Sequence, residues 1–158
     1  MTDFTVTDAD PPRDLEDVKR LFRAYVDWLG IDLSYQGFEE ELAALPGKYV
    51  PPTGALLLAK TSSDVSIGCV ALRPMADEGI CEMKRLYVAP EGRASGVGSS
   101  LVSAVLQRAR SAGYRYMRLD TLPTMEGAIR LYKAAGFVEI PPYYDTPIEE
   151  TVFLQCAL

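Results

Sequence analysis

The chain has 158 residues, of which 48% are hydrophobic, and its formal net charge is -6. This length suits a single domain over residues 1–158, and this apolar content predicts a globular protein with a sizeable core. The acidic balance argues against general nucleic-acid binding, which needs clustered Lys and Arg, and no apolar run is long enough for a membrane span, so we expect neither kind of partner.

The first half of the chain predicts one strand, two helices and three further strands. Residues 4–7 alternate like a short strand. Asp10-Pro11 reads as an N-cap followed by a proline at the first helical position, and apolar residues at helical spacing continue to Gly30. A short helix is expected over residues 38–45. Strands are expected over residues 55–60, 66–73 and 79–88, with a hairpin loop between the first two.

The second half alternates strands and helices. After a loop over residues 90–95, a strong helical pattern begins at Val97, with apolar residues four positions apart, and Gly113 ends it. A strand over 116–121, a helix over 128–135 and strands over 137–140 and 150–157 follow. Clustered strands followed by two strand–helix alternations predict an α/β fold of the mixed α+β type, with helices on both faces of a mixed sheet.

Cysteine and histidine usage limits the chemistry. Cys69, Cys81 and Cys156 lie far apart in apolar surroundings and form no CxxC pair, which predicts small buried thiols and no zinc or redox site. The N-terminus lacks the features of a signal peptide, so we expect a cytoplasmic protein. Histidine is absent, so acid–base chemistry must come from Asp, Glu, Tyr, Lys, Cys or water.

A glycine-containing loop precedes the helix that begins at Val97. It reads Arg93-Ala94-Ser95-Gly96-Val97-Gly98. Glycines let the backbone approach a ligand, and the unpaired N–H groups of a first helical turn, together with the helix dipole, form an anion site. Because Arg93 adds a positive charge and a donor fork, the loop predicts a pyrophosphate site.

The loop does not match two common phosphate-binding motifs. A dinucleotide-binding loop needs a third glycine where this chain has Leu101, and a Walker loop needs a Gly-Lys step that is absent here. Taken alone, two glycines before a helix fit a plain turn as well as a ligand site. A nucleotide-binding protein is therefore the weakest of the functions that we consider.

Two segments together resemble the GCN5-related N-acetyltransferase (GNAT) family. Residues 81–90 followed by 93–98 are similar to the family's central motif, whose cofactor loop reads Gln/Arg-x-x-Gly-x-Gly/Ala. Residues 131–137, Leu-Tyr-Lys-Ala-Ala-Gly-Phe, are similar to its following motif at the usual separation. The resemblance implies a mixed, mostly antiparallel sheet of six to seven strands, flanked by about four helices, with a splayed central strand pair that holds acetyl-CoA.

The resemblance also implies how acetyl-CoA binds, as a cosubstrate and without a metal. Backbone groups of Leu86, Tyr87 and Val88 would pair with pantetheine. Backbone amides would cradle the pyrophosphate over Arg93, Ala94, Ser95, Gly96, Val97, Gly98 and Ser99. Many family members have a cofactor-contacting Asn where this chain has Met125. Met cannot supply that donor, and backbone groups or Thr121 are the candidates to replace it.

The implied activity is acetyl transfer to a primary amine of a small molecule, amino acid or peptide by direct attack. Glu82 resembles the family's catalytic glutamate and is our base candidate; the alternatives are a solvated strand carboxylate or one paired with Lys84 or Arg85. Tyr132 matches the tyrosine that points at the coenzyme sulfur and is our acid candidate; the alternative is a core aromatic. A strand bulge typical of the family decides whether Glu82 and Lys84 share a face.

The sequence does not identify the residues that bind the acceptor amine. Tyr143 and Tyr144, in the proline-rich loop before the last strand, are expected either to line an acceptor pocket or to pack the loop. Trp28 and Tyr35 are likewise expected either to close the acceptor pocket from the other side or to pack the protein, while Tyr25 is expected in the core. The alternative function is a non-catalytic acyl-CoA-binding or sensing module, and family members often form homodimers.

Overall fold

A computed structural model describes residues 3–158, and its elements follow the expected order. The helices are α1 (Leu15–Leu29), α2 (Phe38–Ala44), α3 (Val97–Ser111) and α4 (Glu126–Ala134), with short 3-10 turns at Ser34–Gln36 and Pro90–Gly92. The strands are β1 (Phe4–Asp8), β2 (Ala55–Thr61), β3 (Ser66–Pro74), β4 (Ile80–Val88), β5 (Tyr116–Thr121), β6 (Val138–Ile140) and β7 (Val152–Ala157).

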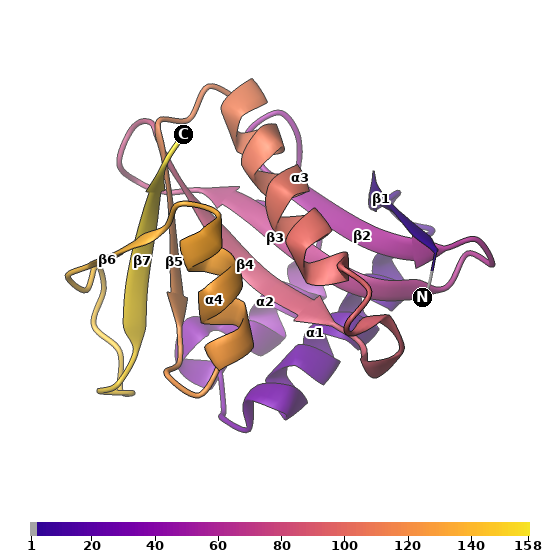
Figure 1. Ribbon diagram of the computed structural model, residues 1–158, viewed down its shortest axis with the longest axis horizontal. Coiled ribbons are helices and arrows are strands. Elements are labelled where there is room, and N and C mark those ends of the chain that lie inside the picture. Colours follow the sequence, from indigo (N-terminus) through magenta and orange to yellow (C-terminus); the bar gives the residue numbers. More distant parts are fainter. Residues whose placement is uncertain (1–2) are drawn as a thin grey trace.

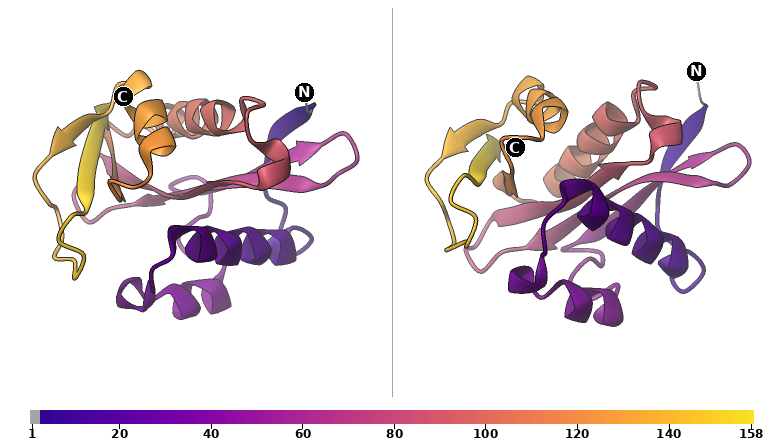
Figure 2. Two further views of the ribbon diagram at one scale, coloured as in Figure 1. Left: turned by 60° about the horizontal axis from the view of Figure 1, so that its bottom comes forward. Right: turned by 90° about the horizontal axis from the view of Figure 1, so that it is seen from below.

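The strands form one seven-stranded sheet in the order β1-β2-β3-β4-β5-β7-β6. Every neighbouring pair is antiparallel except β4 and β5, which run parallel. Figure 1 shows α3 and α4 over one face of the sheet, and Figure 2 shows α1 and α2 beneath the opposite face. The expected mixed, mostly antiparallel sheet flanked by helices is therefore confirmed.

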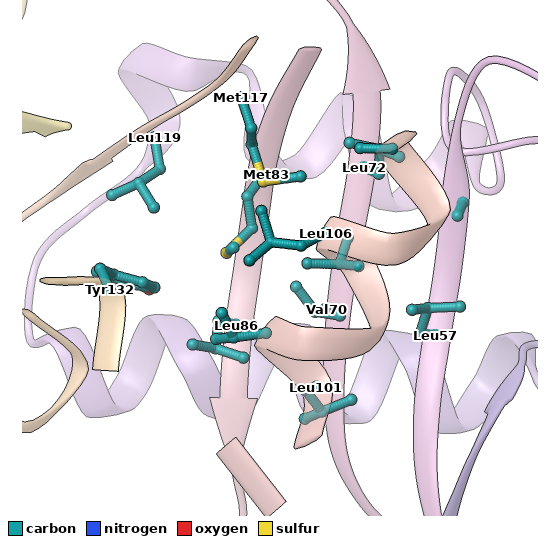
Figure 3. Packing of buried hydrophobic residues seen from close by; sticks show 14 of the residues in the cluster. Leu57, Val70, Leu72, Met83, Leu86, Leu101, Leu106, Met117, Leu119 and Tyr132 are labelled. Carbon is teal, nitrogen blue, oxygen red and sulfur yellow. The ribbon is translucent and has the colours of Figure 1, made fainter. Parts of the chain in front are cut away.

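An apolar cluster lies on each face of the sheet. On the α3 side, Val97, Leu101 and Val105 are almost completely buried against β2, β3 and β4 (Figure 3). On the other side, Leu21 and Phe22 of α1 are fully buried. Each such side chain contributes about 1.5–3 kcal/mol through burial. The four-residue spacing in α3 and the expected burial of all three cysteines are confirmed.

The expected start of the first helix is wrong. The helix begins at Leu15, and residues 11–14 form a turn. Pro11 precedes another proline, which disfavours the helical conformation, so Asp10 cannot open the helix there. Asp14 is the N-cap residue but makes no side-chain capping bond; its buried carboxylate instead accepts hydrogen bonds from the backbone N–H of Asp10 (2.8 Å) and from Lys60 Nζ (2.7 Å).

The expected bulge is present in β4 at Arg85. The register between β3 and β4 shifts by one residue there, and Arg85 has a φ of 61°. Lys84 and Arg85 are adjacent, yet both donate hydrogen bonds to Gln36, which precedes α2. Because the bulge follows Lys84, Glu82 and Lys84 still share a face. The face of the sheet toward α1 and α2 therefore receives three ionisable side chains of β4, those of Glu82, Lys84 and Arg85.

Candidate active site

The two parallel strands separate along their length. β4 pairs with β5 only over Ile80–Glu82, opposite Tyr116–Arg118, while β4 continues to Val88. The backbone N–H of Ala89 donates to Ile67 of β3 at 2.8 Å. Because N–H groups alternate in direction along a strand, the N–H of Val88 points away from β3 and toward the gap. An extended ligand with amide groups can pair with this strand edge.

The gap is a cleft, here called the central cleft, of about 620 Å³ open to solvent. In Figure 3, Leu119 and Tyr132 lie on one side of this space, and Met83 and Leu86 lie on the other. The rest of the lining comes from α1, the segment after it, β4, β5, the start of α4 and Thr151: Tyr25, Trp28, Leu29, Ile31, Leu33, Tyr35, Gln36, Lys84, Arg85, Asp120, Thr121, Leu122, Met125, Ala128 and Thr151.

The glycine loop leads from β4 into α3. Ala94 and Gly96 have φ values of 63° and 81°, and Gly96 is the N-cap residue with no side-chain cap bond. A Cβ atom built on Gly96 meets nothing within 4 Å, so this backbone is open to a ligand. The first N–H groups of a 15-residue helix lack intrahelical partners and carry the positive end of the helix dipole. The loop therefore suits a phosphate.

Arg93 has a more specific position than its sequence suggests. Its Nε donates to the carbonyl oxygen of Val88 at 3.0 Å, and its guanidinium lies 5.5 Å from the ring centroid of Trp28 and 5.9 Å from that of Tyr87. Trp28 is at the end of α1, so these contacts join that helix to the glycine loop. The remaining guanidinium donors stay exposed beside the loop.

Gly98 has a packing role in addition to any ligand contact. A Cβ atom at this position would lie 3.0 Å from Leu131 Cδ1 of α4 and 3.7 Å from Val88 Cγ2. The missing side chain therefore lets α3 and α4 approach each other closely. A contact between Gly98 and a cofactor stays a prediction.

Tyr132 projects from α4 into the central cleft and is only 6% exposed. Its ring packs against Phe137 at a centroid distance of 5.8 Å. Among the described residues, none forms a hydrogen bond with its hydroxyl. Burial raises the pKa of this phenol, so it is protonated at neutral pH. The hydroxyl is therefore available as a proton donor to a ligand in the cleft.

Glu82 is almost fully buried and firmly held. Its Oε1 accepts from Arg73 Nε at 2.8 Å and forms an ion pair with Arg73 Nη2 at 2.7 Å, and its Oε2 accepts from the Tyr143 hydroxyl at 2.6 Å. Burial by itself would raise the carboxyl pKa, but Lys84, Arg73 and these hydrogen bonds together lower it below its ordinary value. Glu82 is therefore ionised at neutral pH, and both oxygens have partners.

A second space, here called the side pocket, lies beside Glu82 and is open to solvent. Its lining consists of Tyr35, Gln36, Arg73, Met75, Glu82, Lys84, Tyr143 and Tyr144. Tyr35, Gln36 and Lys84 also line the central cleft, so the two spaces adjoin at these side chains, a boundary here called the junction. The structure thus places Tyr132 in one space and Glu82 in the other.

Several residues that we considered from the sequence line these spaces. Tyr143 and Tyr144 line the side pocket, and Trp28 and Tyr35 line the central cleft. Tyr25 packs at the edge of the α1 core and also faces the cleft. Tyr144 donates its hydroxyl hydrogen bond to Asp120. The aromatic side chains thus form walls of the site as well as core.

Sequence reasoning missed Arg73, Lys84, Gln36 and Asp120 as site residues. Two weak signals existed: Arg73 is a cation at the end of an apolar strand, and Lys84 is two residues after Glu82, on the same strand face. Gln36 carries no such signal, because its position depends on the fold of the segment between α1 and α2. Met125 and Thr121 both line the cleft where the family Asn was expected.

Within residues 3–158, no group of three or more His, Cys, Asp or Glu side chains is arranged to hold a metal ion. Within the same residues, no helix combines the length and the hydropathy that a membrane crossing requires.

Comparison with known proteins identifies the family. A model of the acetyltransferase (GNAT) family matches residues 16–137. An uncharacterized N-acetyltransferase of Schizosaccharomyces pombe is 44% identical over 144 residues, covering 91% of this chain and 88% of that protein. Another, from Dictyostelium discoideum, is 32% identical over 204 residues, covering 91% and 94%. A crystal structure of a GNAT acetyltransferase from Staphylococcus aureus Mu50 superposes with a TM-score of 0.81 at 17% identity, covering 98% and 99%, and so shares the fold. The chain therefore belongs to the GNAT acetyltransferase family and is an acyltransferase.

Proposed function

We propose that residues 1–158 act as one domain that moves the acetyl group of acetyl-CoA to a primary amine of a small molecule, amino acid or peptide. The amine attacks the thioester directly. The observation that carries this proposal is the junction of the two spaces at Lys84, because it lets a thioester in the central cleft meet an amine in the side pocket. Holding both reactants there supplies much of the acceleration.

Acetyl-CoA fits the central cleft through backbone groups. The strand edge at Leu86, Tyr87 and Val88 suits the amides of pantetheine, since β5 does not pair there. The open backbone at Gly96 and the first turn of α3 suit the pyrophosphate. The proposed pyrophosphate cradle is Arg93, Ala94, Ser95, Gly96, Val97, Gly98 and Ser99. No metal is required for this binding, so chelation by EDTA should leave turnover unchanged.

Tyr132 is the proposed acid. Its buried hydroxyl is protonated and lines the cleft, so it can donate a proton to the departing thiolate and regain one from solvent. The reaction balances without a further reagent. The amine nitrogen bonds to the acetyl carbon, the carbon–sulfur bond breaks, and the sulfur takes the proton.

Glu82 is the proposed base, acting directly or through water. Its carboxylate is ionised, as a base must be, and it faces the side pocket. The lowered pKa limits the driving force for proton transfer from an ammonium group, so Glu82 contributes less than positioning does. Tyr143 holds one of its oxygens at 2.6 Å and thereby fixes its orientation.

The test is release of free thiol from acetyl-CoA across a panel of amines, with wild type and Tyr132→Phe compared side by side. We expect turnover by wild type on at least one amine and a much slower reaction by the variant. If both are equally inert on every amine, the proposed site fails. Calorimetry then separates the remaining case, a protein that binds acetyl-CoA without turnover. Cytoplasmic location and a homodimer stay predictions.

A further inference from the structure

The hydrogen-bond acceptors around the side pocket are already in use. Among the described residues that line it, Glu82 is the one acid, and Arg73 and Tyr143 hold its two oxygens. Asp120, at the adjoining cleft, accepts from the Tyr144 hydroxyl. A second ammonium group on a substrate, as in a polyamine, would thus have to share a carboxylate that already accepts hydrogen bonds from the protein.

The hydrogen-bond donors of the pocket are only partly used. Arg73 directs Nε and Nη2 to one oxygen of Glu82, and Nη1 has no partner among the described residues. Its side chain is 34% exposed. Lys84 has three donors, and it donates one hydrogen bond, to Gln36 Oε1 at 3.1 Å, while its nearest carboxylate, Asp120, is 4.0 Å away. The pocket therefore has spare donors without spare acceptors.

The charges around the pocket also favour an anion. Burial, and then the neighbouring Arg85, lower the pKa of Lys84 despite the opposing effect of Asp120 and Glu82, and Arg73 lowers it further. The part of this lowering that does not come from burial is repulsion between Lys84 and the cations Arg85 and Arg73. An arriving anion would relieve this repulsion, whereas a second cation would add to it.

The spacing of the two cations suits a small molecule. Arg73 lies opposite Glu82 in the sheet and Lys84 lies opposite Ala71, so the two cations are two positions apart along neighbouring strands. At about 3.3 Å per residue, their backbone positions differ by roughly 7 Å along the strand direction. An anionic group beside Arg73 and an amine at the junction beside Lys84 are therefore only a few bonds apart.

Aromatic and thioether side chains form the part of the pocket wall that carries no charge. Tyr143 and Tyr144 pack edge to face with each other at 5.6 Å and with Phe153 at 5.0 and 5.3 Å, so β7 supports both rings from behind. Tyr35 and Met75 complete the lining. These side chains suit an aromatic or thioether body, which aromatic rings and sulfur contact favourably.

We propose that the acceptor is a small amino carboxylate with an apolar or aromatic side chain, such as an α-amino acid, and that Arg73 binds its carboxylate. The amine then points to the junction with the central cleft. This inference rests on the proposed function and narrows it. Arg73 is a specificity-determining residue, and its guanidinium fork suits the two oxygens of a carboxylate.

Matched pairs of amines test this proposal. We would measure kcat/KM for L-phenylalanine against phenethylamine and for L-methionine against 3-(methylthio)propylamine, with spermidine as the cationic contrast. We expect wild type to prefer the carboxylated member by about tenfold or more. Arg73→Gln should remove most of this preference by raising KM for the carboxylated member alone. Equal or reversed preference in wild type would overturn the proposal, as would a preference that survives Arg73→Gln.

Glu82→Gln is the matched control, because it disrupts the same ion pair yet keeps the guanidinium. The kcat/KM of Glu82→Gln is expected to fall for both amines of each pair, while the ratio of the two values stays near that of wild type. Arg73→Lys is the second variant, in case Arg73→Gln does not fold; it keeps the charge without the fork and should lose part of the preference. Circular dichroism checks the fold of each variant.

Calorimetry separates failure of this inference from failure of the proposed function. L-Phenylalanine and phenethylamine are titrated into wild type and Arg73→Gln saturated with coenzyme A. If no amine is acetylated but L-phenylalanine binds through Arg73, the proposed function fails and the pocket assignment stands. If phenethylamine is acetylated as well as L-phenylalanine, the function stands and the carboxylate assignment fails. If neither amine binds and none reacts, both fail.

Discussion

The two ends of the active site are built in different ways. The proposed phosphate end, beside the central cleft, comes from one continuous stretch, the end of β4 followed by the loop Arg93–Gly98 and the first turn of α3. The side pocket gathers side chains from four separate segments: Tyr35 and Gln36, Arg73 and Met75, Glu82 and Lys84, and Tyr143 and Tyr144. The first site is local in sequence and the second depends on the whole fold.

The two ends also use different chemistry. The phosphate end presents backbone N–H groups, which the chain has at nearly every residue and which need only the correct conformation. The side pocket presents charged and aromatic side chains, whose effect depends on partners from distant segments. Substitutions should therefore impair cofactor binding mainly by changing backbone shape, and acceptor use mainly by changing charge.

Gly96→Asp should have the largest effect and should be confined to the phosphate end. A side chain and a negative charge would both enter the open backbone at a φ of 81°. We expect acetyl-CoA binding to weaken by about 1000-fold or more, measured by calorimetry. Gly113→Asp is the control, because Gly113 lies past α3 at a φ of 88° with equally open surroundings. Equal binding by both variants would contradict the assignment of the loop.

Glu41→Ala should show how strongly the fold next to the side pocket depends on a buried ion pair, because Arg85, the partner of Glu41, also donates to Gln36 of the pocket. Glu41 accepts from Arg85 Nε at 3.0 Å and Nη2 at 3.1 Å, and the Arg85 side chain is only 2% exposed. Losing this partner should lower the free energy of unfolding by about 3–5 kcal/mol, measured with urea. Glu39→Ala, which removes an exposed pair on the same helix, should change it by about 0.5 kcal/mol.

Tyr132→Phe tests the proposed acid of the central cleft. Removing the hydroxyl should lower kcat by about 100-fold, because the thiolate then leaves without a proton donor, while acetyl-CoA affinity stays unchanged. Steady-state kinetics and calorimetry measure the two quantities. Tyr116→Phe, on an exposed ring of β5, should keep full activity. A loss of affinity instead of kcat would indicate that Tyr132 only packs the cleft.

Glu82→Gln should have the smallest catalytic effect. The lowered pKa makes Glu82 a weak base, so we expect kcat to fall by about tenfold with acetyl-CoA binding intact. Glu139→Gln, at an exposed position of β6, should leave kcat unchanged. An unchanged kcat in Glu82→Gln would assign the proton to another acceptor and reduce Glu82 to a partner of Arg73 and Tyr143.

The sequence by itself predicted the features that depend on neighbouring residues. The helical spacing of Val97, Leu101 and Val105 located α3, because a helical face is set by residues three and four apart. The Gly96 loop and Tyr132 followed from motifs of a few residues. The predicted start of the first helix was wrong although it also depended on neighbouring residues. Pro12 disfavours the helical conformation of Pro11, and the helix therefore begins only at Leu15.

The tertiary structure alone decided what the site can recognise. The Tyr143–Glu82 and Lys84–Gln36 hydrogen bonds join residues 61 and 48 positions apart, and the stacking of Arg93 on Trp28 joins the glycine loop to α1. No local pattern encodes such pairs. A chain with a net charge of -6 still forms a pocket with spare cationic donors, because the direction of each side chain, and not the total charge, sets the local potential.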